Sequence, residues 1–204
     1  MENINNINNI NNINNTQNLY YFEEVNKNQN KNQNIVNKLQ NNDNINNKQK
    51  IQDLIAKTHE LAEESVVKGC GPFGCIITDE NFNILALNHN RVTELNDPTA
   101  HAEINAIRDA CKALNNFNLS NKILFTSCEP CPMCLSAIYW AKIKDVYYSN
   151  TRIDARNIGF DDDFIYCELE KQIEDRSLNI KRVSSDNSLT SFEMWKLKDN
   201  KLSY

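Results

Sequence analysis

The sequence predicts an α/β fold in three layers, with helices on both faces of a central mixed sheet. Two observations predict it. Between residues 51 and 149, helical and β-rich patterns follow in the order helix, strand, strand, helix, strand, helix, strand. The first two strands are separated by only five residues, which favours an antiparallel hairpin.

The first helix is expected from about residue 50 to residue 67. Apolar residues recur there on one helical face, at Ile51, Leu54, Ile55, Leu61 and Ala62. Gly69, Gly71 and Pro72 then end the helix, because glycine and proline are poor helix formers.

The later elements follow from the same patterns. We expect strands at 73–78, 84–88, 122–126 and 145–149, and helices at 100–114 and 131–141. Past residue 150 the pattern weakens, and the sequence predicts a loop over 151–163 and a short terminal helix over 191–198.

Composition divides the chain near residue 50. The first 50 residues hold 21 asparagines, and we expect residues 1–49 to be a low-complexity, disordered tail. Residues 50–204 are expected to form the functional domain. The first 50 residues carry a net charge of +1 and the remainder −6. An acidic domain is a poor partner for phosphate backbones, so nucleic acid is an unlikely ligand.

The sequence also indicates the cellular compartment. No run approaches about 20 apolar residues, so no membrane helix is expected. The N-terminus lacks the features of a secretory signal, and the seven cysteines are an odd number. We therefore expect a cytoplasmic protein whose cysteines are thiols or metal ligands.

Two short segments at predicted helix starts carry the chemistry. Pro132 suits the first position of a helix, which places Cys131 at the N-cap and Cys134 in the first turn. His101 supplies a third ligand from the other helix. Three ligands leave one tetrahedral position of Zn²⁺ open for catalysis, and Glu103 can reach that side to transfer protons.

A closed structural site is the alternative. Cys128 precedes Cys131 by three residues, so Cys128, Cys131 and Cys134 with His101 could hold zinc as a Cys₃His site. That arrangement leaves Glu103 without a role.

The segments His101-Ala102-Glu103 and Pro130-Cys131-Pro132-Met133-Cys134 resemble the signature of the cytidine deaminase-like superfamily. The runs at 137–141 and 159–162 resemble, more narrowly, the small bacterial-type guanine deaminases. The resemblance implies a five-stranded sheet, one Zn²⁺ per subunit, and deamination of guanine to xanthine and ammonia. It further implies a homodimer that exchanges C-terminal segments.

The resemblance also assigns roles to residues. The zinc ligands are His101, Cys131 and Cys134, and the acid–base residues are Glu103 and Asp162. The substrate-binding residues are Asn90 at the purine edge, Phe73 and Trp140 in the pocket walls, and Tyr204 closing the partner's pocket. Without the resemblance, Phe73 and Trp140 are ordinary core residues, Asn90 a turn residue and Asp162 part of a solvated acidic loop.

Other functions stay open at this point. A tRNA adenosine deaminase shares the same motifs but needs a basic surface to bind RNA. Deamination of cytosine or of a nucleoside leaves the guanine-type runs unexplained. A non-catalytic zinc-binding interaction module predicts bound zinc, four protein ligands and no ammonia release.

Overall fold

The structure, a computed structural model, describes residues 45–202. Contacts divide the chain into a unit that ends at Ile51 and a unit over Gln52–Tyr204. Of the first unit, residues 45–51 are described, and they are helical. The rest of the predicted asparagine-rich tail lies outside the described residues. Helical residues 52–67 begin the second unit, as the apolar pattern predicts.

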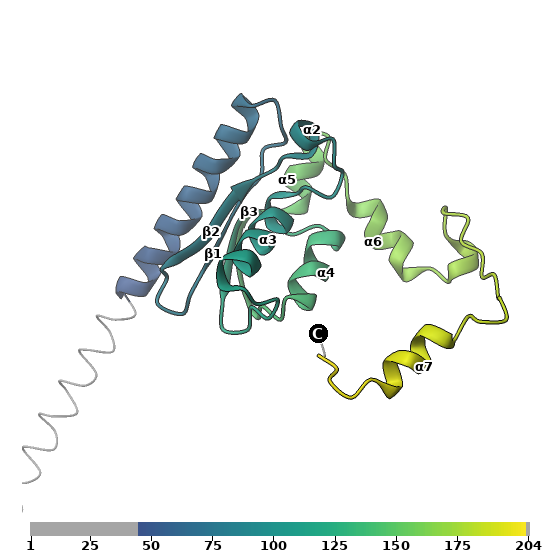
Figure 1. The fold of residues 1–204 in the computed structure, drawn as a ribbon. Helices are drawn as coiled ribbons and strands as arrows, with labels where there is room; N and C mark the ends of the chain where they lie inside the picture. Colours follow the sequence, from purple (N-terminus) through teal and green to yellow (C-terminus); the bar gives the residue numbers. More distant parts are fainter. Residues whose placement is uncertain (1–44, 203–204) are drawn as a thin grey trace, which may run out of the picture. The chain divides into compact units, whose positions relative to one another are not determined.

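A mixed sheet of four strands forms the centre of the second unit, in the order β2-β1-β3-β4 (Figure 1). β1 (Gly74–Thr78) pairs antiparallel with β2 (Ile84–His89) and with β3 (Ile123–Cys128). β3 pairs parallel with β4 (Asp145–Asn150). The expectation of five strands is wrong, because no later segment of the described chain pairs with the outer edge of β4.

Helices cover both faces of this sheet. Alternate residues of a strand point to opposite faces. Cys75 and Ile77 of β1 share a buried core with α3 (Ala102–Leu114) and α4 (Pro132–Trp140). On the opposite face, Gly74 packs against the first helix, where an added Cβ would lie 2.7 Å from Cβ of Leu61. The helices therefore form an outer layer on each side of the sheet, as predicted.

The chain after β4 departs from the prediction. A helix, α5 (Arg152–Asn157), occupies part of the segment expected to be a loop. Its start is a capping box, in which the side chains of Thr151 and Asp154 each accept the other's backbone N–H. Three short helical segments follow α5 along the chain: α6 (Asp163–Glu170), a 3₁₀ turn at Ile173–Asp175, and α7 (Thr190–Leu197). α7 confirms the predicted terminal helix.

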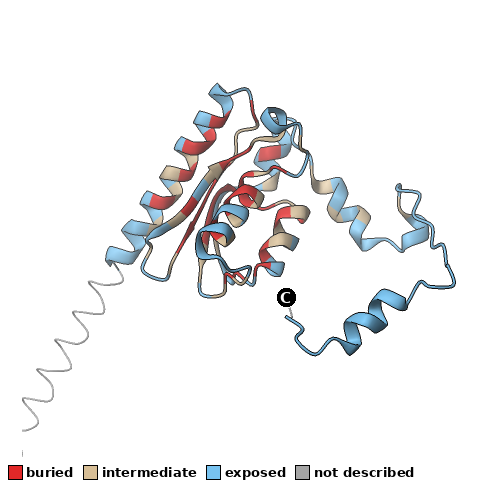
Figure 2. Cartoon of the chain, in the orientation of Figure 1, coloured by how far each residue is buried: buried red, intermediate tan, exposed pale blue. Residues whose placement is uncertain are grey.

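Burial stops near the end of α5. No residue from 161 to 202 is buried, and this stretch is pale blue or tan throughout in Figure 2. Large apolar side chains are nevertheless exposed there, among them Phe192, Met194 and Leu197 of α7. Between residues 45 and 202, no helix is long and apolar enough to cross a membrane.

Candidate metal centre and substrate cavity

Three side chains from two neighbouring helix starts form a candidate metal centre. His101 is the N-cap of α3, Cys131 is the N-cap of α4, and Cys134 lies in the first turn of α4. The sulfurs of Cys131 and Cys134 lie 3.6 and 3.5 Å from Nδ1 of His101. One ligand atom from each residue lies within 4.8 Å of the others. Zn²⁺ favours nitrogen and sulfur ligands, so this donor set fits zinc.

The sequence around Cys131 explains its placement. Pro132 occupies the start of α4, and the residue before a proline is held in an extended conformation, as Cys131 is at φ −65° and ψ 167°. A hydrogen bond from Cys134 and the contact with His101 together lower the pKa of the Cys131 thiol to about 4, against the effect of burial. The same bond raises the pKa of Cys134. Cys131 is thus a thiolate donor at neutral pH.

Cys128 stands apart from this centre. Among the residues that the structure describes, the group able to hold a metal consists of His101, Cys131 and Cys134. The sulfur of Cys128 instead lies 3.6 Å from the backbone oxygen of Thr151, and burial raises its pKa to about 11. The geometry therefore favours three protein ligands over the closed Cys₃His alternative.

Glu103 lies directly beside the metal centre. It is the second residue of α3, and only 5% of it is exposed. Its Oε1 accepts a hydrogen bond from Thr126 at 3.1 Å, and its Oε2 lies 3.4 Å from the sulfur of Cys134. Burial raises the pKa of Glu103 above its usual range. This carboxyl group is held rigidly in a position from which it can accept and return a proton.

A cavity of about 620 Å³ opens over the centre. Its lining includes six of the residues that the sequence and the resemblance single out, namely Phe73, Asn90, His101, Glu103, Cys131 and Asp162. Phe160 also lines it, and its ring packs edge-on against Phe73 with 5.0 Å between centroids. Glu129 and Arg152 are further lining residues. Sequence reasoning missed these three, although Phe160 and Glu129 lie within or next to the recognised motifs.

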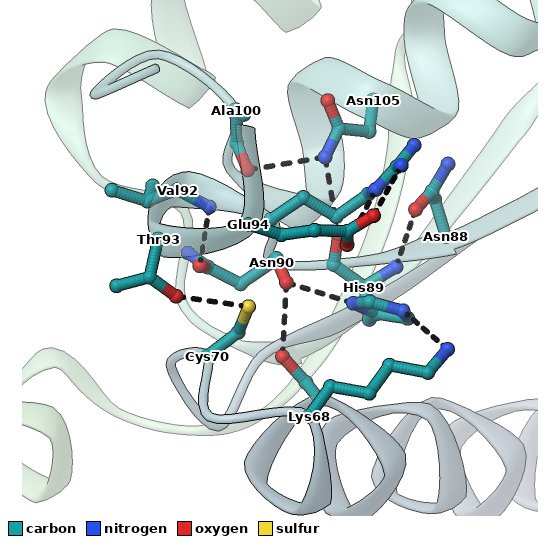
Figure 3. Close-up of polar contacts among 12 residues, drawn as sticks. Lys68, Cys70, Asn88, His89, Asn90, Val92, Thr93, Glu94, Ala100 and Asn105 are labelled. Carbon is teal, nitrogen blue, oxygen red and sulfur yellow. Dashed lines mark hydrogen bonds and ion pairs between the residues drawn. The ribbon is translucent and has the colours of Figure 1, made fainter. Parts of the chain in front are cut away.

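Asn90 lies at the end of β2 with its side chain fixed by the backbone. It is 4% exposed, and its Oδ1 accepts a hydrogen bond from the N–H of Val92 at 3.1 Å (Figure 3). Its own N–H donates to the oxygen of Phe73 at 2.9 Å. Because Oδ1 already accepts one hydrogen bond, Nδ2 is the more available polar atom of this amide for a ligand in the cavity.

Asp162 directly precedes α6 and also faces the cavity. Its Oδ1 is buried and has no hydrogen-bond partner within residues 45–202. Burial raises the pKa of Asp162, with the negative charge of Cys131 adding to the effect. A buried oxygen without a partner is costly, so this carboxyl group is suited to a ligand that donates a hydrogen bond.

Trp140 is the one described site residue that lies neither in the metal centre nor in the cavity lining. Trp140 is the last residue of α4 and is 63% exposed. An α-helix rises about 1.5 Å per residue, so about 9 Å of helix separates Trp140 from Cys134. Tyr204 lies outside the described residues.

Comparison with known proteins identifies the motif-bearing region. Residues 48–150 match the family described as the cytidine and deoxycytidylate deaminase zinc-binding region. The chain belongs to this family. Membership agrees with the metal centre, because His101, Cys131 and Cys134 all lie within the matched residues.

One relative within this family extends the similarity beyond the zinc-binding region. The chain is 49% identical over 145 residues to the guanine deaminase of Bacillus subtilis, covering 71% of this chain and 92% of the relative. The X-ray structure of a Bacillus subtilis guanine deaminase superposes with a TM-score of 0.72 at 46% identity, over 75% of this chain and 98% of that one.

A second kind of relative covers less of the chain. The tRNA-specific adenosine deaminase of Haemophilus influenzae is 36% identical over 100 residues, or 49% of this chain and 58% of the relative. The similarity to tRNA deaminases is therefore restricted to about half of the chain.

Proposed function

We propose that this protein is a zinc-dependent guanine deaminase, which hydrolyses guanine to xanthine and ammonia. The observation that carries the chemistry is the position of Glu103 beside three residues able to hold zinc, at the floor of a cavity. The identity with a guanine deaminase across 92% of that relative supports guanine as the substrate.

His101, Cys131 and Cys134 are the proposed zinc ligands. When bound, zinc supplies a Lewis acid that makes water a nucleophile near neutral pH. Overall, water adds at C2 of guanine and the bond from C2 to the exocyclic nitrogen breaks. The base gains one oxygen and loses one nitrogen as ammonia, so that guanine and water give xanthine and ammonia.

Glu103 is the proposed proton carrier for this reaction. It takes one proton from the attacking water and passes it to the adjacent ring nitrogen. It then takes the second proton from the hydroxyl group added at C2 and passes it to the departing amine, as the C2 carbonyl forms. Its raised pKa suits this exchange, because a carboxylate whose pKa lies nearer to neutrality is a stronger base and accepts a proton from water more readily. The bond from Thr126 fixes one carboxyl oxygen while the other faces the metal centre.

The remaining cavity residues are proposed to hold the purine. Asn90 offers Nδ2 as a donor to an acceptor atom of the base, because Val92 occupies its Oδ1. Asp162 offers a buried oxygen to the N–H groups of guanine or to the leaving amine. Phe73, supported by Phe160, supplies an apolar wall for the ring.

We further propose that the protein is a homodimer with exchanged C-terminal segments. No residue from 161 to 202 is buried within one chain, yet the segment carries many large apolar side chains. Exposed apolar surface of this kind is typical of an interaction site. The open edge of β4 offers backbone groups for pairing with a second copy. Tyr204 would then close the partner's cavity.

The test is ammonia release by purified, zinc-loaded protein. Guanine, adenine, cytosine, cytidine and an adenosine-bearing anticodon stem-loop are offered in parallel, with Glu103→Ala as the matched control. We expect release from guanine, with xanthine as the product, and none from the control. Release from the RNA instead would establish the tRNA adenosine deaminase alternative, which the partial relatives favour and the acidic domain disfavours. Zinc binding without ammonia from any substrate would identify an interaction module.

A further inference from the structure

The backbone of Asn90 is held by hydrogen bonds from two neighbouring elements. Its carbonyl oxygen lies 2.7 Å from Nδ1 of His89 and accepts a hydrogen bond from the hydroxyl of Ser65 at 3.0 Å. Ser65 also lies 2.6 Å from the carbonyl oxygen of Gly71, which lines the same cavity. An added Cβ at Gly71 would lie 3.4 Å from Cγ of Asn90, so the two segments approach closely.

His89 is held in a single tautomer by its contacts. A carbonyl oxygen can only accept, so Nδ1 of His89 carries the proton that it donates to Asn90. Nε2 is then an acceptor, and the ammonium of Lys68 lies 3.1 Å from it (Figure 3). Glu64 in turn holds Lys68 through an ion pair of 2.6 Å. The imidazole is therefore fixed at both nitrogens.

The backbone of His89 is fixed as well. Its carbonyl oxygen accepts a hydrogen bond at 3.1 Å from the side chain of Asn105, which also bonds the oxygen of Ala100 next to His101 (Figure 3). Only 7% of His89 is exposed. His89 is not part of the cavity lining, whereas Asn90, to which its ring is hydrogen-bonded, is.

We propose that His89 is a positioning residue, which holds the carbonyl of Asn90 through Nδ1–H so that the Asn90 amide meets the substrate in one orientation. The proposal rests on the proposed function in that the substrate is taken to be guanine. Lys68 contributes by fixing the tautomer, since it keeps the proton of the imidazole on Nδ1. Without this bond the backbone at Asn90 can shift, and its side-chain amide then meets the purine correctly in only a fraction of the molecules.

Two variants of His89 separate this role from packing. His89→Leu replaces the imidazole with an apolar side chain of similar size and removes the Nδ1–H donor. His89→Asn retains a donor near the position of Nδ1. Thr58→Val is the matched control, because Thr58 is a fully buried hydroxyl of the same helix as Ser65 that bonds the Ile55 carbonyl away from the cavity.

Steady-state kinetics with guanine give the main readout. We expect His89→Leu to raise KM about tenfold and to leave kcat within about twofold, because the lost interaction serves binding rather than the transition state alone. His89→Asn should recover most of the affinity, and Thr58→Val should behave as wild type. A loss of folded protein would instead lower kcat and zinc content with KM unchanged, which would overturn the proposal.

A double-mutant cycle tests whether His89 acts through Asn90. In an Asn90→Ala background, His89→Leu should produce no further rise in KM, because the group that it positions is already gone. A second, multiplicative rise of about tenfold would show that His89 acts by another route.

A third readout does not require activity. In ¹⁵N–¹H spectra, the side-chain amide of Asn90, assigned by its absence in Asn90→Ala, should give one sharp pair of signals in wild type and His89→Asn. His89→Leu should broaden or multiply them, and unchanged signals would refute the proposal. If wild-type protein releases no ammonia from guanine, the proposed function fails, while these spectra still decide the role of His89.

Discussion

At the scale of single residues, the polar side chains of the cavity lie in different environments. Glu103 is buried between Thr126 and the metal centre, whereas Asp162 has a buried oxygen that no described residue satisfies. Asn90 is held on its backbone and on Oδ1. This difference agrees with the proposed roles, in which Glu103 carries protons while Asn90 and Asp162 hold the purine.

Glu103→Ala should abolish turnover and leave zinc bound. The substitution removes the proton carrier but none of the three ligand side chains, so at least a 10²-fold loss in kcat is expected with about one zinc per subunit. Metal analysis beside the ammonia assay checks this. If zinc is lost in proportion to activity, Glu103 contributes to the metal site and the assigned role is wrong.

At the scale of elements, the packing of the first helix on β1 depends on Gly74. A side chain there would overlap the carbonyl of Thr58 and approach Cβ of Leu61 to 2.7 Å and the backbone nitrogen of Ala62 to 2.9 Å. Two of these three atoms belong to the backbone, which cannot move without shifting the helix.

Gly74→Ala should therefore destabilise the protein by about 3 kcal/mol or more, at the upper end of the cost of overpacking a core. Gly69→Ala is the control: open space surrounds Gly69, but its φ of +77° is unfavourable for alanine, at about 1 kcal/mol. Denaturant unfolding of both variants gives the comparison. Equal losses at the two positions would show that the helix can move away from the sheet.

The elements also show how far sequence reasoning reaches. The order and approximate bounds of the hairpin, α3, α4 and β4 follow from periodicity, and Pro132 correctly places Cys131 at a helix start. Sequence reasoning overlooked α5, although Thr151 and Asp154 have the spacing of a capping box. To predict the location of Trp140, one needs the length and direction of α4. To predict the contacts of His89, one needs to know that three segments distant in sequence lie together. Local patterns contain neither kind of information.

At the scale of the whole molecule, residues 161–202 of a single chain, more than a quarter of the domain, contribute no buried residue. The strand order ends at β4, and burial ends before residue 161. A second copy that contributes its own C-terminal segment would cover both the open edge of β4 and the exposed apolar side chains after residue 160. If the segments are exchanged, each cavity contains residues of both chains.

Mixed dimers test this directly. Chains bearing Glu103→Ala and chains bearing Tyr204→Ala are inactive or impaired alone; refolded together, they should regain up to about a quarter of wild-type activity. The reason is that half of the random dimers are mixed, and one of the two cavities in each has both residues intact. Activity no higher than that of the separate variants, or a mass near the 23.6 kDa of one chain, would contradict the exchange.

The two helix starts at the metal centre have an energetic consequence. His101 and Cys131 occupy N-cap positions, and neither side chain makes the hydrogen bond by which serine, threonine or aspartate stabilises a helix start. Each helix thereby forgoes about 1 kcal/mol of capping stability. A metal that joins these two positions to Cys134 restrains both ends together, so ion affinity and the folding free energy of α3 and α4 become one linked quantity. Removal of the metal is therefore expected to lower the stability of both helix starts.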